Sequence, residues 1–197
     1  GSFGGYEDRT SVVYPWDVTY DTTIVDNTVS NSGQNGIYVY GINSSFIGDG
    51  EDEGTVGNVV SNSGWDGIQV YGSSNWMYGG TSYPVYDIWA PASFSTIISD
   101  NSVTNSSDDG IDVGYLDSAT ISRNHISNEM MQENEKGGWD PMDNGIYANT
   151  VDSLTVDHNT VDNAYYGIGL WNDNESTLDS NTLTNIHNIG INVRGAY

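Results

Sequence analysis

One motif recurs six times along the chain and constrains its fold more than any other feature. It is Asn-x-Val-x-Asn, with Ile or Leu in some copies, followed after a short gap by Gly-Ile. The first asparagines of the copies are Asn27, Asn58, Asn101, Asn124, Asn159 and Asn181. The shortest spacings are 22 residues, from Asn159 to Asn181, and 23 residues, from Asn101 to Asn124. A period this short is typical of a solenoid whose coils contain three short strands, and it is too short for paired helices.

Apolar residues alternate with polar ones around each copy. Alternation over three or four residues, with β-branched residues on one side, predicts short strands that bury one face. The isoleucines that we expect in one internal column are Ile37, Ile68, Ile111, Ile146, Ile168 and Ile191. A second row, three residues before the first asparagine, holds Ile24, Ile98, Ile121, Val156 and Leu178. The second copy is irregular in this row, because Thr55 stands where Ile is expected and Val56 follows one place late.

The repeated asparagines and glycines suit the corners between strands. Equivalent residues of stacked coils lie about 4.8 Å apart, so asparagine side chains, which carry both a donor and an acceptor, can hydrogen-bond along the stack. Asparagine also tolerates the left-handed backbone of a sharp corner, and glycine fits a corner where a side chain would clash. We therefore predict a buried or half-buried ladder of the six first asparagines.

The repeats resemble the right-handed parallel β-helix proteins of the pectate-lyase-like superfamily. The segments that carry the resemblance are "TIVDNTVSNSGQNGIYV", "TVGNVVSNSGWDGIQV", "IISDNSVTNSSDDGIDV", "TISRNHISN", "LTVDHNTVDNAYYGIGL" and "TLDSNTLTNIHNIGINV", within residues 11–195. The resemblance implies an all-β fold, a right-handed parallel β-helix solenoid of about six three-strand coils. Because many unrelated functions share this scaffold, function has to be inferred from sites.

The resemblance also implies a domain organisation. We expect an N-terminal segment over residues 1–10 and a single β-helix domain over residues 11–197, with a first strand near residues 12–14. Insertions are expected at residues 41–55, 72–95 and 129–144, and all three are predicted to flank the strand that begins with Gly-Ile. Insertions on one face of a solenoid usually mark the working face.

The net charge of −23, from 27 acidic and four basic residues, repels nucleic acid and anionic membranes, so we expect neither as a partner. A salt-rich habitat, bound divalent cations and simple solubility all remain explanations of this acidity. No apolar run is long enough to span a membrane, and no cysteine is present. The start "GSFGGYEDR" is typical of a tag remnant or a processed mature end. We therefore expect an extracellular or cell-surface protein.

The outer side of the Gly-Ile strand is predicted to carry an aromatic and polar strip. The candidate ligand-binding residues on it are Tyr38, Tyr40, Gln69, Tyr71, Tyr147 and Trp171. Such a strip fits a glycan cleft, because sugar rings stack on aromatic faces. It fits a protein contact surface equally well, because Tyr and Trp are enriched there too.

Aspartates provide the candidate chemistry. Asp109 and Asp112 lie in "SSDDGIDV", and Asp66 precedes the equivalent glycine one coil earlier. Stacked carboxylates can form the acid and base of a glycosidase, and "DDGID" resembles the acidic motifs of polygalacturonases, although Gly-His-Gly and Arg-Ile-Lys are absent. "GWDPMDNG" resembles the Asp-Pro-His segment of mannuronan epimerases, with Met142 in place of histidine. Arg194 is the basic candidate on the outer side of the Gly-Ile strands. The alternative is that the aspartates are solvated corner residues.

A second acidic cluster lies in the first insertion. Asp49, Glu51, Asp52 and Glu53 offer hard oxygen ligands that suit Ca²⁺, and a solvated acidic loop is the alternative. The sequence requires no cofactor, and Ca²⁺ is the candidate cation. We expect Ca²⁺ or high salt to stabilise the fold, because counter-ions relieve self-repulsion.

Two functions remain open. The first is a structural scaffold that associates with copies of itself, because terminal coils expose strand edges and the aromatic loop at residues 72–95 offers apolar area for lateral contacts. The second is a carbohydrate-binding or carbohydrate-active domain, which as an enzyme would be a glycoside hydrolase or a polyuronate lyase or epimerase. We favour the scaffold without strong hydrolytic or lyase activity, because no complete set of acid, base and cation can be assembled.

Overall fold

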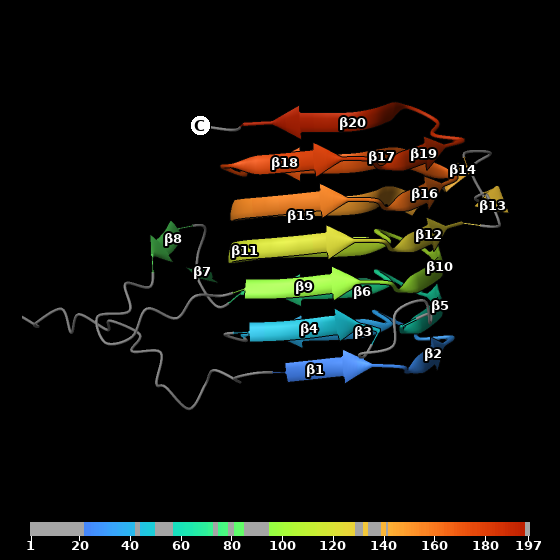
Figure 1. Cartoon of the computed structure of the whole chain (residues 1–197), viewed down its shortest axis with the longest axis horizontal. Coiled ribbons are helices and arrows are strands. Elements are labelled where there is room, and N and C mark those ends of the chain that lie inside the picture. Colours follow the sequence, from blue (N-terminus) through green and yellow to red (C-terminus); the bar gives the residue numbers. More distant parts are fainter. Residues whose placement is uncertain are drawn as a thin grey trace, which may run out of the picture.

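The computed structural model describes residues 22–41, 44–49, 57–72, 75–78, 81–84, 95–128, 132–133, 139–140 and 142–195. Within these ranges every regular element is a β-strand (Figure 1). The strands are β1 (Thr22–Val25), β2 (Thr28–Ser30), β3 (Ile37–Tyr40), β4 (Ser44–Gly48), β5 (Val59–Ser63), β6 (Ile68–Tyr71), β7 (Asn75–Tyr78), β8 (Thr81–Pro84), β9 (Ser95–Ser99), β10 (Ser102–Ser106), β11 (Ile111–Ser122), β12 (His125–Ser127), β13 (Gln132–Glu133), β14 (Trp139–Asp140), β15 (Met142–Asp157), β16 (Thr160–Asp162), β17 (Ala164–Trp171), β18 (Ser176–Asp179), β19 (Thr182–Thr184) and β20 (Ile189–Arg194). None of the described residues belongs to a helix that could cross a membrane.

Parallel strands of successive repeats stack into three columns, and Figure 1 shows these strands one above another. One column is the six-stranded sheet β2-β5-β10-β12-β16-β19. The Gly-Ile strands pair in the order β3-β6-β11-β15-β17-β20, and the third column runs β1-β4-β9-β11-β15-β18. β11 and β15 belong to both of the last two columns, because each continues through a corner at Tyr115 or Thr150, where φ is left-handed. The antiparallel pairs β7–β8 and β13–β14 lie in the insertions.

The interior is filled by aligned apolar side chains. The register joins Ile37, Ile68, Ile111, Ile146, Ile168 and Ile191 into one column. The first five are buried, and Ile191 on β20 is half-exposed. The predicted isoleucine column is therefore confirmed.

The second repeat departs from the prediction. Ile47 on β4 pairs with Ile24 and Ile98 and is fully buried, so it fills the row that we expected near Thr55 and Val56. The extra residues of this repeat follow β4 and precede Asn58, at a different corner from the Gly-Ile strand. The predicted insertion over residues 41–55 beside that strand was therefore wrong. The alternation of apolar and polar residues does not reveal at which corner a coil is lengthened. Thr55, Val56 and the strand expected near residues 12–14 lie outside the described residues.

Described strands bound the other two predicted insertions. One follows the Gly-Ile strand β6 and ends before β9 at Ser95. The other precedes the Gly-Ile part of β15, which begins at Met142 and so shortens the predicted insertion by three residues. Both therefore flank the Gly-Ile column.

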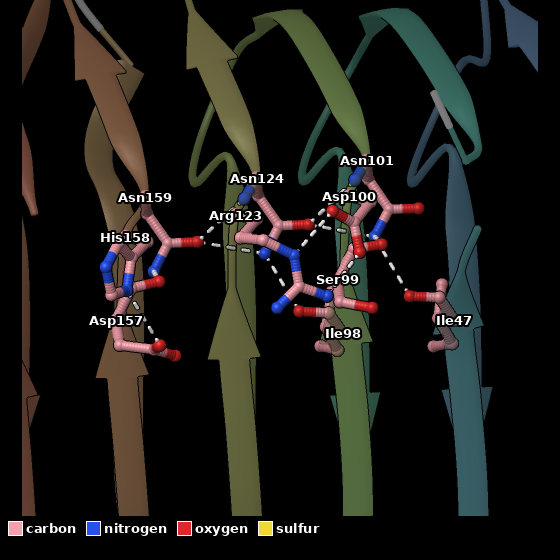
Figure 2. A network of polar contacts seen from close by, with 10 residues as sticks. All are labelled: Ile47, Ile98, Ser99, Asp100, Asn101, Arg123, Asn124, Asp157, His158 and Asn159. Carbon is pink, nitrogen blue, oxygen red and sulfur yellow. Dashed lines mark hydrogen bonds and ion pairs between the residues drawn. The ribbon is translucent and has the colours of Figure 1, made fainter. Parts of the chain in front are cut away.

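The six first asparagines form the predicted ladder, and Figure 2 shows its middle steps at Asn101, Asn124 and Asn159. At each step one Oδ1 accepts hydrogen bonds from both the backbone N and the Nδ2 of the preceding asparagine, at 2.9–3.1 Å. The four inner asparagines are buried, whereas Asn27 at one end is exposed. The left-handed conformation falls on other residues, namely those just before most ladder positions and five of the six second asparagines. The ladder thus satisfies buried backbone groups that a corner would otherwise leave unpaired.

Candidate functional site

The Gly-Ile strands present two parallel rows of side chains on their outer side. The first row contains Tyr38, Gln69, Asp112, Tyr147, Gly169 and Asn192. The second row contains Tyr40, Tyr71, Gly114, Asn149, Trp171 and Arg194. Because these positions are set by strand register, their spacing is rigid, which a binding surface requires.

Exposed aromatic rings lie towards the two ends of this face. Tyr38 and Tyr40 are exposed, and their rings stack with centroids 6.5 Å apart. Trp171 is 41% exposed, and the guanidinium of Arg194 lies 5.4 Å from its ring centroid. Tyr71 is less accessible, because its ring packs edge-on against Tyr115.

A hollow opens beside Trp171. Its lining includes Asn144, Tyr147, Tyr166, Trp171, Asn192 and Arg194. Gly169 forms part of its floor, and a Cβ atom there would lie 2.7 Å from Asn144 Oδ1. Sequence reasoning missed Asn144 and Tyr166, because both precede the glycine of a Gly-Ile pair and so lie at the corner. Their shared position before that glycine is the signal that could have found them.

Three aspartates meet near the middle of the face. One carboxylate oxygen from each of Asp66, Asp109 and Asp112 lies within 4.8 Å of the others. Asp66 and Asp109 precede β6 and β11, and Asp112 is the second residue of β11. Their exposed fractions are only 4%, 7% and 4%. The interpretation as solvated corner residues was therefore wrong, because side chains from neighbouring coils cover them.

Hydrogen bonds hold each carboxyl group in place. Asp66 Oδ1 accepts from the backbone N of Asp109 at 3.1 Å. Asp109 Oδ1 accepts from both the backbone N and the Nδ2 of Asn144, each at 2.8 Å. Asp112 Oδ2 accepts from Tyr71 Oη at 2.6 Å and Gln69 Nε2 at 2.8 Å, while its Oδ1 is buried without a partner.

The cluster has an unusual electrostatic environment. Burial raises the pKa of Asp66 to about 7 and that of Asp109 to about 8, with further increases from the charges of Asp112 and Asp108. Burial also raises the pKa of Asp112, although the hydrogen bonds from Tyr71 and Gln69 oppose this shift. The two ion pairs found among the described residues, Arg123–Asp100 and His158–Asp157, lie elsewhere. The carboxyl groups therefore have no cationic side chain of the described chain to stabilise their charged forms.

A protonated and an ionised carboxyl group side by side are the elements of glycosidase chemistry. In this site the carboxyl groups are covered, and the free oxygen of Asp112 is itself buried. Arg194 lies on β20, separated from β11 by β15 and β17, so it does not complete a catalytic set with them. The sequence therefore predicted the convergence of the aspartates, but Arg194 belongs to the hollow.

The aspartate cluster offers fewer free oxygens than a calcium site requires. Three oxygens of the aspartate cluster already accept hydrogen bonds, whereas Ca²⁺ takes roughly six to eight oxygen ligands. We therefore assign no cation to this cluster. Of the predicted calcium ligands, Asp49 is buried at the end of β4, and Glu51, Asp52 and Glu53 lie outside the described residues. Calcium binding in that loop stays a prediction.

The stacked parallel columns and the asparagine ladder define a β-helix solenoid. The sequence matches the family model of the right handed beta helix region over residues 12–183. This chain belongs to that family, and its winding is right-handed, as the resemblance implied. No curated protein and no solved structure matches the chain.

Proposed function

We propose that this β-helix domain binds a neutral polysaccharide along the outer face of its Gly-Ile strands without hydrolysing it. The observation that carries the proposal is the placement of exposed aromatic rings at separate points of one rigid face. Tyr40 on β3 and Trp171 on β17 are four strand steps apart, or about 19 Å at the usual strand spacing. This length accommodates several sugar rings, and aromatic faces offer them an apolar surface with polar rims.

The charge of the protein favours a neutral ligand. A net charge of −23 repels polyanions at low ionic strength. Asn144, Asn192 and Gln69 supply amide donors and acceptors on or beside the face, which suit the hydroxyl groups of a neutral glycan. Arg194 lies over Trp171 and shapes the hollow.

The covering of the carboxyl groups supports binding without hydrolysis. Asp66, Asp109 and Asp112 are each less than 8% exposed, so a glycosidic oxygen cannot approach them without movement of the surrounding side chains. We therefore expect binding without release of reducing ends. An extracellular or cell-surface location fits this role and is part of the proposal.

Substitution of Trp171 by alanine is expected to weaken polysaccharide binding at least about tenfold, because it removes the stacking surface and one wall of the hollow. The measurement is affinity electrophoresis through gels that contain a neutral β-glucan, xyloglucan or mannan, with polygalacturonate as the anionic comparison. Trp65→Ala is the matched control, because Trp65 is 53% exposed in the turn before β6, outside the two outer rows.

Retardation by a neutral polysaccharide that is lost in Trp171→Ala and retained in Trp65→Ala supports the proposal. Equal retardation of the two variants contradicts the proposal. So does a wild-type protein that is not retarded in any gel containing a neutral polysaccharide. Reducing-end release that Asp109→Asn or Asp112→Asn abolishes would instead establish a glycoside hydrolase.

Self-association is the second candidate. Ile191 and Val193 on β20 are half-exposed, and β20 pairs only with β17 among the described residues. A second copy stacked on this strand would cover both side chains and pair its free backbone groups. The aromatic loop that we expected to add lateral contacts has no described side chains.

Val193→Asp is expected to dissociate such assemblies, because it places a charge in the interface. Sedimentation velocity over a wide concentration range provides the measurement, and Asp152→Ala, at an exposed position of β15, is the control. A wild-type protein that stays monomeric at high concentration would rule out this second candidate.

A further inference from the structure

The corner before the Gly-Ile strands carries a second row of stacked polar side chains. Asn35, Asp66, Asp109 and Asn144 each immediately precede the glycine of a Gly-Ile pair. The isoleucines of these pairs are in register, so the four side chains occupy equivalent positions in successive coils. The row therefore places two aspartates between two asparagines.

The step from Asn144 to Asp109 shows how this row is held together. The backbone N and the Nδ2 of Asn144 both donate to Asp109 Oδ1, each at 2.8 Å. The asparagine ladder repeats the same pattern, for example where the backbone N and Nδ2 of Asn58 donate to Asn101 Oδ1 at 3.1 and 3.0 Å. In both cases one side-chain oxygen accepts from a backbone donor and a side-chain donor together.

The step from Asp109 to Asp66 keeps only the backbone half of this pattern. The backbone N of Asp109 donates to Asp66 Oδ1 at 3.1 Å. Asparagine would supply an Nδ2 donor at this step, but Asp109 has only carboxyl oxygens, and one of them lies within 4.8 Å of an Asp66 carboxyl oxygen. Two ionised oxygens in a buried position repel each other, whereas a protonated carboxyl group has a donor and nearly the shape of an asparagine side chain.

We propose that Asp66 and Asp109 share one proton, so that protonated Asp109 takes the place of an asparagine in this second ladder and donates to Asp66. The proton replaces the side-chain hydrogen bond that the step would otherwise lack. This role concerns the stability of the solenoid and does not depend on polysaccharide binding.

The surroundings of the pair favour the neutral form. Asp112 faces it from β11, Asp108 from the preceding turn, Tyr71 from β6 and Tyr147 from β15. Asp112 and Asp108 are acidic, and negative neighbours disfavour a further charge, whereas the two tyrosines stay neutral because their pKa values are raised. The raised pKa values of Asp66 and Asp109, about 7 and about 8, agree with a proton that is retained at neutral pH.

The raised pKa values make the free energy of unfolding depend on pH. Both folded-state pKa values lie above the ordinary value of 3.8. The stabilisation is therefore fully present at a pH below the unfolded pKa and is lost as the pH rises through about 7 to 8. Loss of the shared proton should therefore make the wild-type protein less stable at pH 9 than at pH 5.5.

Asp109→Asn tests this inference, because asparagine supplies the donor without a proton that can be lost. We expect the fall in the urea unfolding midpoint of the full chain between pH 5.5 and pH 9, measured in chelator, to be at least halved in this variant. Asp108→Asn is the matched control, because it removes a neighbouring exposed charge but leaves the carboxyl pair in place, so it should keep most of the wild-type pH dependence. Equal pH dependence in Asp109→Asn and the wild type would overturn the proposal.

A direct measurement covers the case in which Asp109→Asn does not fold. Carboxyl ¹³C resonances of the wild-type protein should include two coupled aspartates that titrate near neutral pH, and titration of every aspartate below pH 5 would overturn the proposal. Urea unfolding in millimolar Ca²⁺ at pH 9 is the last measurement. Restoration of wild-type stability by Ca²⁺, absent in Asp109→Asn, would show that a cation and not a proton joins the two side chains. None of these measurements depends on a glycan, so their failure leaves the proposed function untouched.

Discussion

Substitution of Asn101 by leucine is expected to destabilise the solenoid by about 1–3 kcal/mol for each buried group that it leaves unpaired. Asn101 Oδ1 accepts from the backbone N of buried Asn58. Figure 2 shows that Asn101 Nδ2 donates to the carbonyl oxygens of Ile47 and Ser99. Leucine has a similar size but provides neither donor nor acceptor. The backbone N of Asn58 is therefore the first group expected to lose its partner.

The loss should appear as a lower midpoint of thermal or urea unfolding. Asn27→Leu is the matched control, because the same substitution at the exposed end of the ladder leaves the freed groups open to water. An Asn101→Leu variant with the wild-type midpoint would show that the ladder contributes nothing to stability.

Gly67→Ala is expected to destabilise the fold by an amount near or above the upper end of about 1–3 kcal/mol, the usual cost of overpacking. A Cβ atom at this position would lie 2.2 Å from Val103 Cγ1 and 2.6 Å from the carbonyl oxygen of Gly110. The valine side chain is fully buried and the carbonyl belongs to the next coil, so neither can move without disturbing the stack. The clash explains why glycine precedes isoleucine at this corner.

Gly33→Ala is the control for this prediction. No atom lies within 4 Å of a Cβ built at Gly33, so alanine should be accepted there with little change. Chemical unfolding of the two variants beside the wild type provides the measurement. Similar midpoints for Gly67→Ala and Gly33→Ala would contradict the close-packed corner.

The repeat made the fold predictable. The repeated motif identifies the equivalent residues of neighbouring coils, so the isoleucine column and the asparagine ladder follow from it even where a coil is longer than 22 or 23 residues. The prediction failed at Ile47, because the added residues of that coil hide the register and only strand pairing shows where they lie. Spacing therefore identifies regular coils and becomes ambiguous in a lengthened one.

The candidate site was only partly visible in the sequence. Alternation placed Tyr38, Tyr40 and Trp171 on the outer face, where they are exposed. It also brought Asp112 to that face, but it could not show that the side chain is buried. Burial depends on Tyr71 and Gln69 from the neighbouring coil, and their conformations are set by packing and not by periodicity.

The sequence by itself determined the solenoid, its internal columns and its corner ladder, because each depends on a local pattern that is repeated in every coil. Only the tertiary structure decided that Asp66, Asp109 and Asp112 are buried together and that Arg194 lies apart from them with Trp171. The physical reason is that the protonation and accessibility of a carboxyl group depend on every neighbour within a few ångströms. In a solenoid those neighbours come from coils more than 20 residues away in the chain, and their side-chain conformations have no periodic signature.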